Sequence, residues 1–173
     1  MSGATVLSKA IKDEGIMTPV CFVGSHVSAL PLEVLKKEPS IDLVLCNEGV
    51  YALRNLLKTD INDTEGLAQI KGIGYRKNGR PVLTAPEQIV SQERMDIDLP
   101  GYAWDLLPYD KKPLDLYRAH FWHAEYDHGK RTPFAAIYTS LGCTFRCDFC
   151  MINILNRNDQ TPIGVAGNYS KMR

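Results

Sequence analysis

The sequence has no long hydrophobic run, no excess of charge of one sign and no cluster of basic residues. No stretch approaches the roughly 18 to 20 consecutive apolar residues that span a bilayer, and the N-terminal residues include no apolar segment of signal-peptide length. We therefore expect no membrane span and a cytoplasmic location. Lys and Arg together number 20, Asp and Glu also number 20, and no basic run exceeds two residues. Binding to nucleic acid normally depends on excess positive charge, so we expect no nucleic-acid partner.

What the chain does have is the composition of a globular protein. Its 173 residues are 45% apolar and 23% charged, and this length allows one full domain or two partial ones. The five cysteines are an odd number, and three of them fall within residues 143–150. Because a disulfide framework normally has evenly paired cysteines in an exported chain, metal or redox chemistry is the better interpretation.

Helical and strand-like patterns alternate through residues 1–60. Apolar spacing predicts helices over residues 4–14, 31–37 and 50–58, and short apolar runs predict buried strands over residues 19–23 and 41–45. The residues expected on the apolar sides of the first and third helices are Val6, Ala10, Ile11, Leu53, Leu56 and Leu57. This order predicts an α/β fold with a partial Rossmann-like parallel sheet, right-handed crossovers and helices on both faces.

The middle of the chain has a different character. Two alternating segments flank Asn78-Gly79, which predicts a β-hairpin over residues 70–84. Residues 85–130 are rich in proline and aromatic residues, and we expect those aromatics to pack against the flanking units. The predicted division is a partial Rossmann-like domain at 1–66, a hairpin and interdomain linker at 67–130, and the start of a second domain at 131–173.

The three clustered cysteines follow a segment that reads as a strand, residues 133–140. Cys143, Cys147 and Cys150 have the spacing C-x₃-C-x₂-C, so one loop could direct three thiolates at a common centre. Three ligands are one too few for a closed zinc site. A cubane iron–sulfur cluster bound by three thiolates leaves its fourth iron open to an external ligand, which is a catalytic feature.

This segment resembles the radical S-adenosylmethionine superfamily, whose C-x₃-C-x-aromatic-C motif is matched by Cys143, Cys147, Phe149 and Cys150. The resemblance implies a partial β/α barrel, a 4Fe-4S cluster held by the three cysteines, and S-adenosylmethionine as cofactor, with Phe149 next to the adenine through its backbone. It also implies reductive cleavage of that cofactor to a 5′-deoxyadenosyl radical. The implied partners are an electron donor such as flavodoxin or ferredoxin and a small-molecule substrate.

The N-terminal half resembles the later strands of the cobalamin-binding domain found in one large subclass of that superfamily. The usual forms are a Gly-Gly-x-His turn after one strand and Gly-Glu-Gly-Glu after the next, and here they read Gly24-Ser25-His26 and Asn47-Glu48-Gly49-Val50. Segment 104–108 also looks like the interdomain segment of that subclass. By this resemblance Gly24, Ser25, His26 and Glu48 would contact cobalamin, and the reaction would be methyl transfer or another C–H functionalisation.

Several alternatives stay open. The early strands of a cobalamin domain and most of a radical domain are absent, so we expect an internal fragment that retains the cluster ligands without turnover. The cysteines could instead form a structural zinc site completed by His123, His128 or Cys46, giving a non-catalytic module. A truncated, inactive fragment folded only over residues 16–60 is a further alternative. His26 could bond neighbouring backbone, and Glu48 could cap the helix that begins near Val50.

Overall fold

A computed structural model describes residues 2–107, 120, 124–132, 134–135 and 149–150. The described residues fall into two compact units, one comprising residues 2–99 with 149–150 and the other lying within residues 100–140. Among the described helices, none combines the length and apolar character needed to cross a bilayer. The first unit carries the sheet.

The sheet of the first unit has four strands in the order β1-β2-β3-β4. Strand β1 (Cys21–Val23) pairs in parallel with β2 (Leu43–Leu45), as the sequence predicts. The remaining strands, β3 (Ile73–Lys77) and β4 (Arg80–Leu83), form the predicted hairpin. Strand β3 also pairs antiparallel with β2, so the hairpin continues the sheet, whereas the sequence analysis placed it outside. The result is a partial Rossmann-like α/β fold with a mixed sheet.

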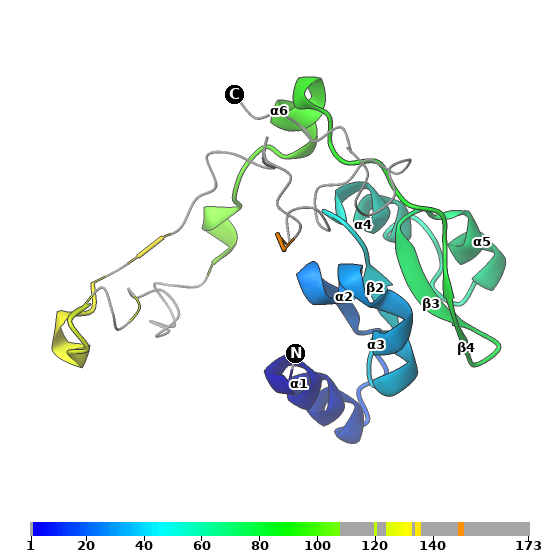
Figure 1. Ribbon diagram of the computed structural model, residues 1–173, viewed down its shortest axis with the longest axis horizontal. Helices are drawn as coiled ribbons and strands as arrows, with labels where there is room; N and C mark the ends of the chain where they lie inside the picture. The colour runs from blue at the N-terminus through cyan, green and yellow to red at the C-terminus, as the bar shows by residue number, and fades with distance from the viewer. Residues whose placement is uncertain (1, 108–119, 121–123, 133, 136–148, 151–173) are drawn as a thin grey trace. The chain divides into compact units, whose positions relative to one another are not determined.

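Strand β2, which is labelled in Figure 1, lies inside the first unit. It is buried on both faces, and its side chains divide the core into two clusters. Leu43 and Leu45 lie on one face with residues of α4 (Val50–Leu56) and α5 (Thr64–Gln69). Val44 lies on the other face with residues of α2 (Ser25–Ala29) and α3 (Pro31–Lys37). Because successive side chains of a strand point to opposite faces, this one strand requires helices on both sides of the sheet.

The hairpin turn has the conformation that its sequence predicts. Asn78 and Gly79 both have positive φ, at 53° and 76°. A two-residue turn with positive φ at both positions matches the twist of the strands that it joins, and Asn-Gly is the pair that adopts it most readily. The hairpin signal of the sequence is therefore confirmed.

Two helices bury other residues than those expected, except that Leu56 of α4 is buried as predicted. The first, α1 (Ser2–Asp13), forms as predicted, but Val6 is 67% exposed while Ser8 is 1% exposed and hydrogen-bonds to Ser40 with 2.8 Å between the hydroxyl oxygens. In α4 the buried residues are Ala52 and Leu56, whereas Leu53 and Leu57 are exposed. In both helices the packed stripe is rotated from the one that apolar spacing predicts.

The second unit is described only in parts. It contains a 3-10 helix at Trp104–Leu106 and another at His128–Lys130. The rings of Tyr102 and Trp104 lie 5.0 Å apart between centroids. The predicted strand at residues 133–140 falls almost wholly outside the described residues, and the role of residues 85–130 as a linker between domains stays a prediction.

Arg76 of β3 closes the C-terminal end of α3. Its guanidinium donates hydrogen bonds to the backbone carbonyls of Leu35, Glu38 and Ile41. The last carbonyls of a helix have no partner within the helix, so a guanidinium at this end satisfies them and also offsets the negative end of the helix dipole. One side chain thereby ties α3 and the loop before β2 to the hairpin.

We expect Arg76→Ala to lower the free energy of unfolding by about 2 kcal/mol or more, because hydrogen bonds from a charged donor to partly buried carbonyls are each worth about 1.5 to 3 kcal/mol. Urea unfolding followed by circular dichroism measures the change. Arg80, an exposed arginine of the same hairpin, is the matched control, and its alanine variant should stay within about 0.5 kcal/mol of the wild type. Equal losses in the two variants would contradict this role.

Candidate functional site

The carboxyl ends of β1 and β2 bring the two turns singled out by the sequence together. Val23 and Leu45, the last residues of these strands, are register partners. The turns at residues 24–26 and 46–49 therefore leave the sheet side by side. Gly49 confirms how close they are, because a Cβ built on it would lie 3.3 Å from Cγ2 of Val23. In α/β folds ligands bind at this edge of the sheet.

Ser28 joins the two turns by a hydrogen bond. The backbone N–H of Asn47 donates to the Ser28 hydroxyl oxygen over 3.0 Å. Asn47 itself has a φ of 62°, a left-handed conformation that asparagine tolerates better than most residues. The preceding residue, Cys46, donates its N–H to the carbonyl of Gly72 over 2.8 Å. The second turn is thus held from both sides, and the sequence offered no signal for the part that Ser28 plays.

The first turn leaves open space beside its glycine. Gly24 has a φ of 128°, and no heavy atom lies within 4 Å of a Cβ built on it. Ser25 is half-buried and begins α2, a short helix that the sequence analysis did not predict, and His26 is exposed in the first turn of that helix. The backbone at Gly24 can therefore be approached closely by another group.

Glu48 has a partner in the chain. Its carboxylate oxygen Oε2 accepts a hydrogen bond from the backbone N–H of Val90 over 2.9 Å. The N-cap position of α4 is Gly49, with a φ of 75°. A side chain predicted to face a ligand or to cap a helix therefore binds a segment that lies more than forty residues further along the chain.

A cluster of three charged side chains and one tyrosine joins α4 to α6 (Met95–Asp98). Asp98, whose side chain is 9% exposed, accepts hydrogen bonds from Arg94 and from the Tyr51 hydroxyl, the latter over 2.7 Å. Arg54 lies 3.8 Å from the same carboxylate and 4.7 Å from the centre of the Tyr51 ring. The hydrogen bond from Arg94, followed by that from Tyr51, lowers the pKa of Asp98.

The cysteines of the predicted cluster loop are described in part. Cys143 and Cys147 lie outside the described residues. Cys150 is half-buried and not in a disulfide, and the neighbouring Phe149 is 94% exposed. Where the structure describes the chain, no group of three His, Cys, Asp or Glu side chains is placed to hold a metal. The three-cysteine site therefore stays a prediction.

Cys46 lies outside the clustered motif. It is half-buried at the end of β2, and burial raises its pKa to about 11. Its thiol is therefore protonated near neutral pH, which disfavours both nucleophilic chemistry and metal binding. This disfavours Cys46 as the fourth ligand of a structural zinc site, and it makes Cys46 a useful control for the motif cysteines.

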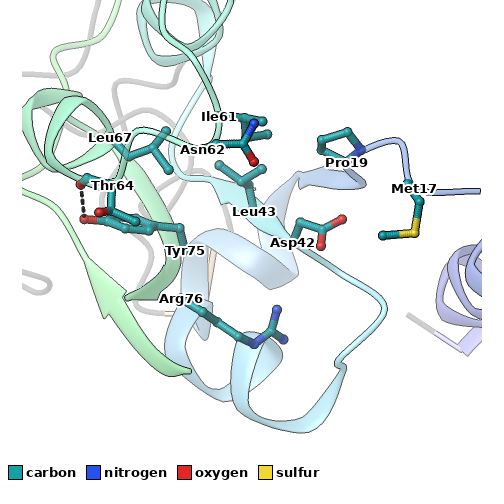
Figure 2. Close-up of a pocket in the computed structure, with 10 residues that line it drawn as sticks. All are labelled: Met17, Pro19, Asp42, Leu43, Ile61, Asn62, Thr64, Leu67, Tyr75 and Arg76. Atoms are coloured by element: carbon teal, nitrogen blue, oxygen red, sulfur yellow. Dashed lines mark hydrogen bonds between the residues drawn. The ribbon is translucent and has the colours of Figure 1, made fainter. Parts of the chain in front are cut away.

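A pocket of about 310 Å³ lies at the opposite edge of the sheet, where β2 begins (Figure 2). The polar side chains that line it already bind other parts of the fold. Asp42 accepts a hydrogen bond from the N–H of Val20 over 2.7 Å and pairs with Lys12 at 2.8 Å, and Arg76 binds the carbonyls at the end of α3. The Tyr75 hydroxyl donates to the carbonyl of Thr64. The sequence analysis did not anticipate this pocket.

Comparison with known proteins relates the chain to enzymes. No protein-family model matches it. The chain is 30% identical over 150 residues, 87% of its length, to an uncharacterized methyltransferase of Pyrococcus horikoshii. It is 26% identical over 118 residues, 68% of its length, to the anaerobic magnesium-protoporphyrin IX monomethyl ester cyclase of Synechocystis sp.. The chain spans 28% and 20% of the lengths of these two relatives. Both relatives are named as enzymes, so we expect enzymatic activity.

We expect Asp98→Asn to destabilise the protein near neutral pH and to flatten its acid dependence. The folded-state pKa of Asp98 is lowered, so its carboxylate stabilises the fold above the unfolded pKa, and this contribution disappears as the pH falls through the folded pKa. Urea unfolding at a series of pH values from about 6 to about 2 measures the effect.

The matched control for this measurement is Asp96→Asn, which removes an exposed carboxylate from the same helix. Its stability profile should run parallel to that of the wild type. If Asp98→Asn also ran parallel to the wild type across the acid range, the assigned role of the Arg94 and Tyr51 hydrogen bonds would be wrong.

Proposed function

We propose that this chain is part of a radical S-adenosylmethionine enzyme, with Cys143, Cys147 and Cys150 as ligands of a 4Fe-4S cluster. The observation that carries the proposal is the cysteine spacing C-x₃-C-x₂-C with an aromatic residue, Phe149, directly before the third cysteine. The similarity to a methyltransferase and to an anaerobic cyclase supports an enzyme rather than a structural module.

The chemistry of the donor set fits the cluster. Thiolates are the usual ligands of iron–sulfur clusters, and three of them leave one iron available for the amino and carboxylate groups of S-adenosylmethionine. When bound, the cluster would supply the electron that cleaves this cofactor to methionine and a 5′-deoxyadenosyl radical. The part of the chain's own residues is to bind and orient: the cysteines hold the cluster, and the backbone at Phe149 would lie beside the adenine.

Cobalamin is the second cofactor that we propose, for the edge formed by the two turns of the first unit. The open space beside Gly24 fits close approach of a ligand, and Ser25 and His26 follow it on α2. Glu48 fits a contact with cobalamin less well, because its carboxylate already binds the backbone of Val90. The replacement of the usual second glycine by Ser25 also narrows the room at this turn.

The reaction class follows from these cofactors. Methyl transfer is favoured by the name of one relative, and another C–H functionalisation of a small molecule is the broader class. An electron donor such as flavodoxin or ferredoxin would reduce the cluster, and the cytoplasm would provide the reducing environment that it needs. The chain spans about a quarter of its relatives' length, so the reaction stays a proposal for the whole protein.

Anaerobic reconstitution with iron and sulfide tests the cluster. We expect the wild-type chain to develop a broad absorption band near about 400 nm, and Cys147→Ala to lose it, because two thiolates hold a cubane too weakly. Cys46→Ala is the matched control and should keep the band, since that thiol is protonated and outside the motif. Tight binding of one zinc ion without a chromophore would contradict the proposal and support the structural zinc site instead.

For cobalamin we expect weak or no retention by this chain. The described sheet offers the carboxyl edge of two parallel strands, and the Glu48 carboxylate there already has a backbone partner. Equilibrium dialysis against hydroxocobalamin measures retention, with His26→Ala as a variant that should behave like the wild type. Retention at micromolar concentration by the wild-type chain would show this expectation to be wrong, and its loss in His26→Ala would assign the contact to His26.

A further inference from the structure

Residues 85–98 run along the carboxyl edge of the sheet and are fastened at three points. The carbonyl of Ala85 accepts a hydrogen bond from the N–H of Gly72 over 2.7 Å. The N–H of Val90 binds Glu48, and Asp98 binds Tyr51 of α4. In Figure 1 this segment leads from the end of β4 to α6, beyond α4. It therefore connects the hairpin, the second turn and α4 in that order.

The first fastening depends on a glycine. Gly72 has a φ of 74°, and a Cβ built on it would lie 2.7 Å from Cβ of Glu87, closer than real carbon atoms approach. Only a glycine lets the segment lie directly against the chain before β3. The start of the segment is thus fixed to the sheet by backbone contact.

The middle fastening is the one that involves the candidate site. Val90 is 2% exposed, although it lies outside helices and strands. Its N–H donates to Glu48 Oε2 over 2.9 Å, and a buried donor left without a partner is costly. Val90 is the single buried residue between Ala85 and Asp98, and the others there are exposed or half-buried. Glu48 therefore holds the one buried residue of the segment.

We propose that residues 85–98 form a strap, meaning a segment that opens locally. The hydrogen bond from Val90 to Glu48 holds the middle of the strap closed and is its catch. The cluster around Asp98 holds the end of the strap and is its outer anchor. Segments with few buried side chains open with a lower free energy than the core, so the strap can open while the sheet stays folded. When the strap is closed, the Glu48 carboxylate faces Val90. A ligand that binds at this edge through Oε2 of Glu48 competes with the N–H of Val90 for that oxygen, and opening of the strap removes this competition. The inference does not depend on the cluster or on cobalamin.

Hydrogen exchange of the full chain, resolved to the Val90 amide, tests the catch. Glu48→Ala removes the acceptor, and Glu48→Gln is the matched variant that keeps an oxygen acceptor of the same reach without the charge. We expect Glu48→Ala to speed exchange at Val90 by about tenfold or more, and Glu48→Gln to change it less than about threefold. Exchange at Tyr75 in β3 reports opening of the core and should stay at the wild-type rate in both variants.

Trypsin cleavage after Arg94 tests the outer anchor. Tyr51→Phe removes the hydroxyl that binds Asp98 and keeps the ring beside Arg54, so it should fold and should be cleaved after Arg94 several-fold faster than the wild type. The strap is contradicted if Glu48→Ala leaves Val90 exchange unchanged, or if it speeds exchange at Tyr75 by the same factor. Should Glu48→Ala fail to fold, the Tyr51→Phe result decides, and unchanged cleavage after Arg94 would overturn the proposal.

Discussion

The burial of β2 on both of its faces is the constraint on which the described fold depends. Leu43 and Leu45 point to one side and Val44 to the other, so helices must cover both sides of the sheet. The strand also needs a neighbour at each edge, and β1 and β3 supply them. Crossover helices bring β1 and β2 into parallel alignment, and their turns then meet at the carboxyl edge.

At that edge the residues singled out by the sequence pattern also hold the fold together. Gly24 leaves open space, as a ligand-binding turn requires, whereas Glu48 is engaged by Val90. Ser28 holds the two turns at a fixed separation through the N–H of Asn47. The same few residues therefore stabilise the edge and form its chemical surface, and a ligand that binds Glu48 must compete with a contact that already exists.

Local patterns predicted local structure well. The helix predicted over residues 31–37 is α3, which begins at Pro31, and Asn78-Gly79 forms the predicted hairpin turn. In both cases the backbone preference lies in the residues themselves. The packed side of α1 was not predictable from spacing, because it depends on a hydrogen bond between Ser8 and Ser40. The same holds for Arg76, whose carbonyl partners precede it by 35 to 41 residues. Contacts of this kind arise only once the sheet has assembled.

The candidate functional site likewise has one part that local sequence patterns predict and another that depends on the assembled fold. The thiolate chemistry of Cys143, Cys147 and Cys150 can be argued from spacing alone, since three ligands in one short loop limit the metal centres that they can hold. Iron and acid-labile sulfide analysis of the anaerobically isolated chain tests this central claim most directly. The account predicts about four iron and four sulfide per chain with negligible zinc. One zinc per chain, with neither iron nor sulfide, would contradict it.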